Sequence, residues 1–462
     1  MATAPRAATD TPAAGRTPPG PPAHPLWGHA RESGRDRLGF RLALAARYGD
    51  VARYRLGPVT LYQVSHPEHI ARVLQDNARN YDKNTVGFRL LRPVLGDGLL
   101  TSDGAPWLAM RRLMQPAFHR RRIAALGATM TGVAERMIAT WDPIAARGGA
   151  LDIAAAMGDL TFGIATATLF GADGGADAAA IRRAVAAIGA DVAFRLDTPF
   201  YPPPRVPTPR NRRVLATRRL LDRVVDDLVA RRRRAGADTD DLLGLLLAAR
   251  DAATGAALDD RQLRDEAITL LLAGHETTAN ALSWAWYLLA THPDAERHLA
   301  AELAAVLGGR TPTTDDLPRL PYTRMVVEET LRLYPPAWVV TRRALGDDRL
   351  GPYRIPAGAT VAISPYVTHR RPDLWPRPAA FAPERFAPGD AAPPRPRYAY
   401  LPFGGGPRQC IGNAFALTEL QLVLATIARR YRLRLAPGQR VEPEALVTLR
   451  PRDGLRMLAE PR

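Results

Sequence analysis

The chain has 462 residues, 46% of them hydrophobic, which is typical of a globular protein with a large core. Its formal net charge is +17, but the arginines are scattered along the chain, so we expect no nucleic-acid partner. A single cysteine excludes an intrachain disulfide, and no apolar run is long enough to cross a bilayer. Residues 1–20 are rich in Ala, Thr, Pro and Gly and lack a signal-peptide core. We therefore expect a disordered tail on a cytoplasmic protein without a transmembrane anchor.

The N-terminal third alternates helices with one hairpin. A helix is expected over 38–48, a hairpin over 51–64 around Gly57-Pro58, and a helix over 67–74. Residues 81–104 show no regular pattern and are expected to be irregular. Trp107 begins another helix and shares one face with Arg111, a pairing that suits a buried carboxylate. A packed tryptophan beside a surface arginine would explain the pair equally well.

The middle of the chain is mostly helical, with helices over 123–190, 210–234 and 241–249. The longest predicted helix is capped by Asp259 or Asp260, runs to His292 and stops at Pro293. At about 1.5 Å per residue it spans roughly 45–50 Å. It is apolar on most sides, so we expect it to cross the core of the domain.

Within this helix, residues 273–278 read A-G-H-E-T-T. A carboxylate and two hydroxyls are costly in a buried helix unless they are satisfied, which makes Glu276 a functional candidate. Thr277 can also bond back to the carbonyl four residues earlier and bend the helix. The two interpretations are compatible, because a widened turn makes room for small molecules.

Further motifs follow in the C-terminal half. Glu329 and Arg332 lie three residues apart on a helix that ends at Pro335-Pro336, so they can pair. A strand is expected over 338–342 and a hairpin over 353–361. Residues 403–412 read F-G-G-G-P-R-Q-C-I-G and precede a helix over 414–420.

The single cysteine, Cys410, is surrounded by features that stabilise a thiolate. A helix N-terminus stabilises negative charge on sulfur, and Arg408 can reach an anion beside it. Gly406 and Gly412 allow a flat group to approach the backbone. A buried structural cysteine in a glycine-rich turn is the alternative.

The pattern F-x-x-G-x-R-x-C-x-G resembles the haem-binding signature of the cytochrome P-450 family. W-x-x-x-R at 107–111, A-G-x-E-T-T at 273–278, E-x-x-R at 329–332 and P-E-R-F at 383–386 match further motifs of that family, in its order. The resemblance covers about residues 20–460. It implies a single, mainly α domain over 21–462 with a small β region.

The resemblance also implies site residues. Haem b would be held with Cys410 as the axial thiolate, and Arg343 competes with Arg342 as a propionate ligand. Thr277 would hold the proton network at dioxygen, Glu276 would deliver protons, and His275, at a variable motif position, is not expected to bind iron. Glu329, Arg332 and Arg385 are assigned to folding and haem incorporation. The expected haem contacts are Trp107, Arg111, Ala273, Gly274, Arg342, His369, Phe403, Gly404, Arg408, Cys410 and Gly412.

The implied reaction is monooxygenation, in which R–H, O₂, two electrons and two protons give R–OH and water. Electrons are expected from a separate ferredoxin or flavodoxin-type donor with its reductase. A basic face for that donor is expected at Arg111, Arg112, Arg120, Arg121 and Arg122. The expected substrate pocket is apolar and includes Phe88, Leu91, Leu99, Val339 and Val340.

The substrate class stays open at this point. Residues 338–343 resemble those of actinobacterial family members that hydroxylate terpenes, so a terpene or other hydrophobic secondary metabolite comes first and a fatty acid second. A peroxide-using haem-thiolate enzyme usually lacks the acid–threonine pair at 276–277. A non-catalytic haem or ligand-binding protein would need no such pair.

Overall fold

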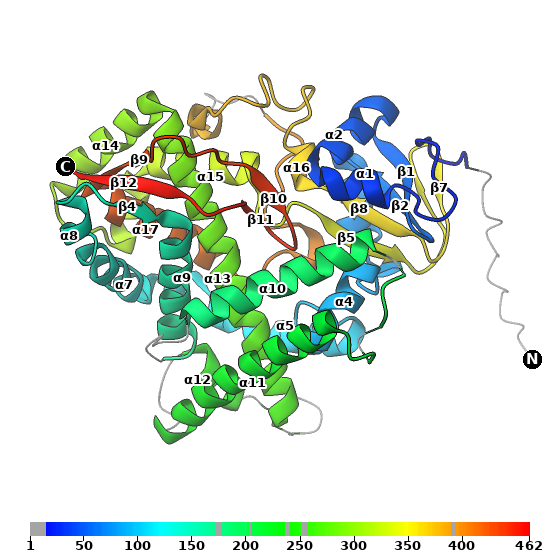
Figure 1. Cartoon of the computed structure of the whole chain (residues 1–462), viewed down its shortest axis with the longest axis horizontal. Coiled ribbons are helices and arrows are strands. Elements are labelled where there is room, and N and C mark those ends of the chain that lie inside the picture. Colours follow the sequence, from blue (N-terminus) through cyan, green and yellow to red (C-terminus); the bar gives the residue numbers. More distant parts are fainter. Residues whose placement is uncertain are drawn as a thin grey trace, which may run out of the picture.

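The computed structural model describes residues 15–171, 178–198, 200–203, 205–235, 241–248, 250, 255, 257–389 and 394–462. These residues form a mainly helical domain with small sheets, as expected (Figure 1). Its α-helices are α1 Ala30–Arg35, α2 Arg37–Tyr48, α3 Pro67–Ala71, α4 Val86–Leu95, α5 Gly104–Met114, α6 Arg120–Ala125, α7 Gly127–Ala139, α8 Asp142–Ala145, α9 Ile153–Leu169, α10 Ala178–Asp197, α11 Pro209–Ala235, α12 Leu242–Ala248, α13 Asp260–Thr291, α14 Pro293–Leu307, α15 Pro321–Leu333, α16 Pro365–Thr368 and α17 Asn413–Ala428.

Helix α13 runs through the centre of the helical region (Figure 1). Asp259 caps it: its side chain accepts from the Gln262 N–H at 2.7 Å, and its own N–H donates to the Gln262 side chain at 3.1 Å. Pro293 lies just after its C-cap, His292, and begins α14. Most of its residues are buried against α9, α15 and α17, because the helix is apolar on nearly every side.

The strands lie mainly at the two ends of the molecule in Figure 1. Within the described residues, one sheet has the order β1-β2-β8-β5-β3, in which β2 and β8 are parallel and the other neighbours antiparallel. A second sheet has the order β4-β12-β9, and β6-β7 and β10-β11 form pairs. The bounds are β1 Val51–Leu56, β2 Val59–Val64, β3 Tyr81–Asp82, β4 Ala150–Asp152, β5 Val340–Ala344, β6 Asp348–Leu350, β7 Tyr353–Ile355, β8 Thr360–Ile363, β9 Tyr431–Leu435, β10 Pro443–Ala445, β11 Leu449–Pro451 and β12 Arg456–Pro461.

Two expectations about local structure were wrong. The segment 353–361 is no hairpin, because β7 pairs with β6 while β8 lies between β2 and β5. The stretch 81–104 is not wholly irregular, since it contains strand β3 and helix α4. Helix α4 includes Pro93, and this internal proline together with the short apolar repeat obscured its periodicity.

A disordered tail was expected over residues 1–20, but residues 16–20 are bonded to the domain. Residues 1–14 lie outside the described residues, but Arg16 exchanges backbone hydrogen bonds with Pro352 and Arg354, both at 3.0 Å. The Arg53 N–H donates to the Pro19 carbonyl at 2.7 Å. Residues 16–20 therefore run along β7 and then along β1, which are edge strands with unpaired backbone groups.

A buried ion-pair network ties α15 to the segment before the Cys410 loop. Arg332 donates to the two carboxylate oxygens of Glu329 at 2.6 and 2.8 Å, and both side chains are fully buried. Arg385, from the P-E-R-F motif, donates to the same carboxylate at 3.3 Å. The remaining Arg332 donors bind the carbonyls of His369, Pro378 and Ala380 at 2.7–2.9 Å. Every strong donor of Arg332 is thus satisfied, which is what makes a charge tolerable there.

Removing the Glu329 carboxylate would leave Arg332 buried without its counter-charge. We expect Glu329→Ala to lower the free energy of unfolding by about 3–5 kcal/mol. Urea unfolding followed by circular dichroism measures the change. Arg297→Ala is the control, because it breaks a pair whose side chains are 68% and 81% exposed. That variant should change stability by less than about 1 kcal/mol, and equal effects in both would contradict the structural role.

Candidate active site

The loop before α17 closes tightly on itself and carries Cys410. The Cys410 N–H donates to the Phe403 carbonyl at 3.0 Å. Gly404 and Gly406 have positive φ angles of 67° and 66°. A Cβ at residue 406 would lie 1.7 Å from the Leu74 carbonyl oxygen, so glycine is required there. These glycines let the loop pass close to the Leu74 backbone before α17 begins.

Cys410 is accessible, although the surrounding protein is dense enough that burial raises the pKa of its thiol. The Gly412 N–H and the charges of Arg111 and Lys83 act in the opposite direction. Cys410 thus keeps an exposed surface in otherwise dense surroundings. A bound metal ion deprotonates a coordinating thiol outright, so an iron centre at Cys410 would overcome the effect of burial.

Lys83 and Arg342 form a cluster of buried cations with Arg408. Lys83 and Arg342 are each 7% exposed. The Lys83 Nζ donates to the Leu100 carbonyl at 2.8 Å, and the Arg342 Nη1 to the Thr341 carbonyl at 2.9 Å. Burial lowers the pKa of Arg342 to about 10 and that of Lys83 well below its usual range, and repulsion among the three cations adds to both shifts.

The nearby carboxylate, Asp103, already pairs with Arg408. Within the described residues, no carboxylate forms an ion pair with Lys83 or Arg342. Two further negative charges would relieve the cluster, because a buried cation needs a counter-charge. The residues present therefore fit a flat cofactor with two carboxylates, such as haem b.

Arg342, not Arg343, belongs to this cluster. The two residues are neighbours in β5, so their side chains point to opposite faces of the sheet. Arg343 pairs with Asp82, with a 3.1 Å contact from its Nε. Strand geometry thus places Arg342 in the cluster and Arg343 on the opposite face, and the propionate contact of Arg342 stays a prediction.

Helix α5 brings Trp107 and Arg111 beside the Cys410 loop. The Arg408 guanidinium lies 4.1 Å from the Trp107 ring centroid. The Arg111 Nη1 donates to the Gln409 carbonyl at 2.7 Å. The structure therefore brings Trp107 and Arg111 together with Arg408 and Cys410, although the two pairs are far apart in the sequence.

His369 has a structural role that differs from the expected propionate contact. Its Nε2 accepts the Leu401 N–H at 2.9 Å, and its Nδ1 lies 3.1 Å from the Arg332 carbonyl. Burial lowers the pKa of His369 to about 3, so the ring is neutral. Both ring nitrogens are occupied by backbone groups, which leaves none to donate to a propionate.

The middle of α13 presents Ala273 and Thr277 on one face, four residues apart. Ala273 is exposed although the helix is largely buried. The Thr277 hydroxyl donates to the Ala273 carbonyl at 2.7 Å, the back-bond that the sequence suggested. A Cβ at Gly274 would lie 3.7 Å from Leu169, so Gly274 lies on the side of α13 that packs against α9.

His275 also faces α9 and is not placed to bind iron. Its ring is 2% exposed and lies 5.8 Å, edge to face, from the Phe162 ring. Burial lowers the pKa of His275 to about 4. The Glu276 side chain points to the turn before β11, where its Oε1 accepts a hydrogen bond from the Thr448 hydroxyl at 2.7 Å. Burial raises the pKa of Glu276, and the Thr448 bond and the charge of Arg450 oppose that shift.

The five residues expected to line a substrate pocket come from α4, the segment after it, and the start of β5. Phe88 packs under the Lys83 ammonium, 5.2 Å from its ring centroid. Leu91 is partly buried against the main core, and Leu99 is 8% exposed within it. Val339 and Val340 are partly buried at the start of β5. Their contact with a substrate stays a prediction.

Lys83 is a site residue that the sequence motifs do not reveal. Its one available signal is that it is the only lysine in a chain rich in arginine. It follows β3, which pairs with β5, so strand pairing brings it near Arg342. This neighbourhood depends on residues about 260 positions apart and has no local pattern.

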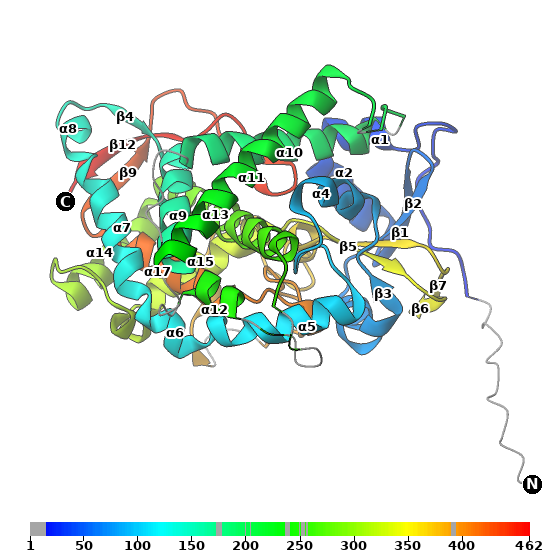
Figure 2. The same ribbon diagram turned by 90° about the horizontal axis from the view of Figure 1, so that it is seen from below.

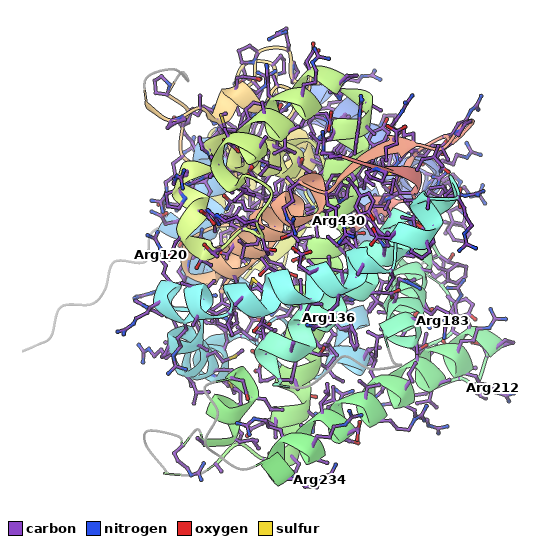
Figure 3. All side chains as sticks on the ribbon, turned by 90° about the vertical axis from the view of Figure 1, so that its left-hand side faces the viewer. Arg120, Arg136, Arg183, Arg212, Arg234 and Arg430 are labelled. Atoms are coloured by element: carbon purple, nitrogen blue, oxygen red, sulfur yellow. The ribbon has the colours of Figure 1, made fainter. Side chains whose placement is uncertain are left out.

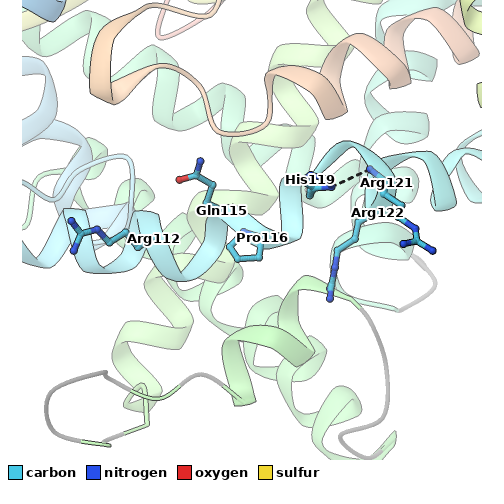
Figure 4. A pocket seen from close by; sticks show the side chains of 6 residues that line it. All are labelled: Arg112, Gln115, Pro116, His119, Arg121 and Arg122. Carbon is cyan, nitrogen blue, oxygen red and sulfur yellow. Dashed lines mark hydrogen bonds between the residues drawn. The ribbon is translucent and has the colours of Figure 1, made fainter.

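An open hollow of about 580 Å³ lies on the surface along α5 and α6. Figure 4 shows its side chains, and Figure 2 shows α5 and α6 along one edge of the molecule. A Cβ at Gly412 would lie 3.7 Å from Phe118, so this surface adjoins the Cys410 loop. The lining residues are Arg112, Gln115, Pro116, His119, Arg121 and Arg122.

The chain belongs to the cytochrome P450 family, whose model matches residues 18–455. It is a haem-thiolate monooxygenase by family. It is 42% identical to cyclooctatin synthase of Streptomyces melanosporofaciens, over 95% of this chain and 94% of that protein. It is 35% identical to pentalenene oxygenase of Streptomyces avermitilis, over 93% and 94%. The retinoic acid bound cyanobacterial CYP120A1 has the same fold, with a TM-score of 0.85, 26% identity and coverage of 97% and 100%.

Across the part of the chain that the structure describes, no helix combines the length and apolar character needed to span a membrane.

The start of α13 holds the segment that follows α4. The Leu99 N–H donates to Glu266 at 3.0 Å, and the Asp97 N–H donates to Asp265 at 2.8 Å. Burial raises the pKa of Glu266 to about 7, the Leu99 N–H opposes the shift, and the charge of Asp265 adds to it. The segment that carries Leu99 is therefore bound to a carboxyl that changes charge near neutral pH.

This raised pKa predicts a pH-dependent stability. The folded state favours protonated Glu266, so its contribution is fully present below the ordinary pKa of 4.5 and is lost as pH rises through about 7. Glu266→Gln stays neutral and should remove that part of the slope. Urea unfolding of both proteins across this range, with the exposed-residue variant Glu32→Gln as control, measures the difference. Parallel curves for wild type and Glu266→Gln would show that folding does not change the pKa of Glu266, which would contradict the prediction.

Proposed function

We propose that this protein hydroxylates a terpene or another hydrophobic secondary metabolite, with O₂ and electrons from a separate redox partner. The observation that carries the proposal is 42% identity, over nearly the whole of both chains, to cyclooctatin synthase. A second relative is named as a cyclooctat-9-en-7-ol 5-monooxygenase and is 41% identical. Fatty acids remain the second substrate class.

The proposed cofactor is haem b, to which Cys410 would supply a thiolate ligand. Lys83, Arg342, Arg408 and Arg111 would neutralise its two propionates. Bound haem supplies the iron at which dioxygen is reduced, and a thiolate ligand favours O–O cleavage. The protein then has to hold the substrate, exclude water and deliver protons.

Glu276 and Thr277 are the proposed proton-handling pair on α13. The Thr277 hydroxyl is fixed on the same helix face as Ala273 by its back-bond, so its oxygen can still accept a hydrogen bond from a ligand or water. Burial raises the pKa of Glu276, so its carboxyl holds a proton at a higher pH than an exposed carboxyl does.

The surface along α5 and α6 is proposed to receive an acidic ferredoxin or a flavodoxin-type donor. It adjoins the Cys410 loop, and Arg112, Arg120 and Arg121 are exposed on it. Other surface arginines belong to separate elements, as the labelled residues in Figure 3 show. Nearness to the thiolate, and not charge alone, therefore distinguishes this face.

Charge reversal tests the donor face. The double variant Arg120→Glu, Arg121→Glu should slow reduction by an acidic ferredoxin about tenfold or more at low salt and flatten its salt dependence. Arg212→Glu, Arg213→Glu on α11 makes the same change in net charge and should leave the rate near that of wild type. Stopped-flow reduction under carbon monoxide measures it, and equal rates for the two double variants would exclude this face.

A spectral titration of the purified ferric protein tests the substrate class. A substrate that fills the pocket beside haem converts the iron from low to high spin and moves the main absorption band to shorter wavelength. We expect a saturable shift with cyclic terpenes and none with medium-to-long fatty acids. A shift with fatty acids alone would reverse the order of the two classes. The absence of any haem absorption would overturn the proposal as a whole.

Thr277→Ala separates a monooxygenase from a peroxide-using enzyme or a non-catalytic haem protein. Loss of the hydroxyl should leave NAD(P)H consumption measurable but divert most of the electrons to hydrogen peroxide, because the proton network at dioxygen loses its fixed member. Product and peroxide per NAD(P)H are the quantities to measure. Thr291→Ala, which removes a similar 2.9 Å back-bond at the end of the same helix, is the control. Unchanged coupling in Thr277→Ala would contradict its role.

A further inference from the structure

The hydrogen bonds of Glu276 lead away from its own helix to a turn near the C-terminus. Its Oε1 accepts the Thr448 hydroxyl at 2.7 Å, and the same hydroxyl oxygen accepts the Asn280 side-chain N–H at 3.1 Å. Thr448 and Asn280 are 6% and 9% exposed. Because the Asn280 amide donates to the hydroxyl, the single Thr448 proton is directed to the carboxylate.

The turn that carries Thr448, residues 446–448 between β10 and β11, is clamped on both sides. The Trp338 indole N–H donates to the Leu446 carbonyl at 2.9 Å, and the Trp284 indole N–H donates to the Leu449 carbonyl at 3.1 Å. The Leu449 N–H donates to the Pro336 carbonyl at 3.0 Å. Both tryptophans are buried, at 4% and 0% exposed. The hydroxyl of Thr448 is therefore held by a backbone that has little freedom to move.

The partly buried carboxyl of Glu276 could otherwise take several rotamers on α13. The bond from Thr448 fixes one of them and occupies Oε1. No described side chain or backbone group is hydrogen-bonded to Oε2. A carboxylate held by one oxygen keeps the other available to accept and release a proton.

We infer that Thr448, oriented by Asn280 and by the clamped turn 446–448, is the positioning residue for Glu276. It holds the carboxyl in the orientation in which Oε2 exchanges protons. This inference rests on the proposed proton role of Glu276. The Thr448 hydroxyl is bonded to Glu276 and Asn280, so Thr448 acts through Glu276 and is not itself a catalytic residue.

The test compares Thr448→Val, which keeps the shape but removes the hydroxyl, with Thr448→Ser, which keeps the hydroxyl. Infrared difference spectra of the ferric protein, recorded against pH, follow the C=O band of protonated Glu276, identified by its loss in Glu276→Gln. A lost hydrogen bond to the ionised form should raise the apparent pKa of Glu276 by about one to two units in Thr448→Val. Thr448→Ser should titrate close to wild type.

Product formed per NAD(P)H is the second readout. We expect a severalfold fall in Thr448→Val, with excess hydrogen peroxide, and recovery in Thr448→Ser. Thr426→Val is the matched control, because Thr426 is equally buried but bonds only within α17, to Leu422 at 2.7 Å. It should change neither readout, and thermal unfolding confirms that each variant is folded.

The outcomes separate this inference from the proposed function. If Glu276→Gln lowers coupling but Thr448→Val matches wild type in both readouts, the inference is overturned. If Thr448→Val shifts the infrared titration while Glu276→Gln leaves coupling intact, Thr448 positions Glu276 but the proton role fails. If product per NAD(P)H falls in Thr448→Val and is not restored in Thr448→Ser, the inference is also overturned, because loss of the hydroxyl would not be the cause.

Discussion

The charge balance beside Cys410 is the constraint on which the site depends. Lys83 and Arg342 are buried, and the nearby Asp103 is already paired with Arg408. Positive charge in such a place is costly without a counter-charge, so these residues suit a ligand that carries negative charge. Two carboxylates of a cofactor would correct the imbalance. Pairing of β3 with β5 is what creates it, so strand register and cofactor binding are linked.

The Glu329–Arg332 network shows the opposite arrangement. There the carboxylate, two arginines and four backbone groups satisfy one another without any ligand. His369 belongs to this saturated region, because its backbone carbonyl binds Arg332 and its ring binds the backbone on both sides. The molecule thus combines a self-sufficient network that orders the segment leading to Cys410 with a cluster of buried cations whose chemistry fits an anionic ligand. An arginine with a structural role has its N–H donors hydrogen-bonded within the protein, whereas an arginine that binds a ligand has donors still available.

Motifs with fixed spacing could be interpreted from the sequence, because their geometry is local. The back-bond of Thr277, the pairing of Glu329 with Arg332 and the capping of α13 by Asp259 depend on residues three or four apart. The long helix follows from its apolar pattern, and the mainly α class is what the resemblance to the family implied. The positions of Lys83, Glu266 and Thr448 could not be predicted, because each depends on a partner more than 160 residues away. The hairpin expected over 353–361 was wrong because β8 pairs with the distant strand β2, while β7 pairs with β6 just before it.

The turn 446–448 contacts three parts of the molecule that no single sequence motif covers: α10, the segment before β5, and α13. Leu446 lies beside Gly189 of α10, where a Cβ would approach its side chain to 3.5 Å, and its carbonyl binds Trp338 just before β5. Two residues later, Thr448 binds Glu276. A shift of α10 or of the segment before β5 must therefore be accommodated by the turn or passed on to the carboxyl, since packed segments do not deform freely. The expected pocket residues Val339 and Val340 follow Trp338 directly. The same short turn would therefore link the contents of the pocket to the position of the Glu276 carboxyl.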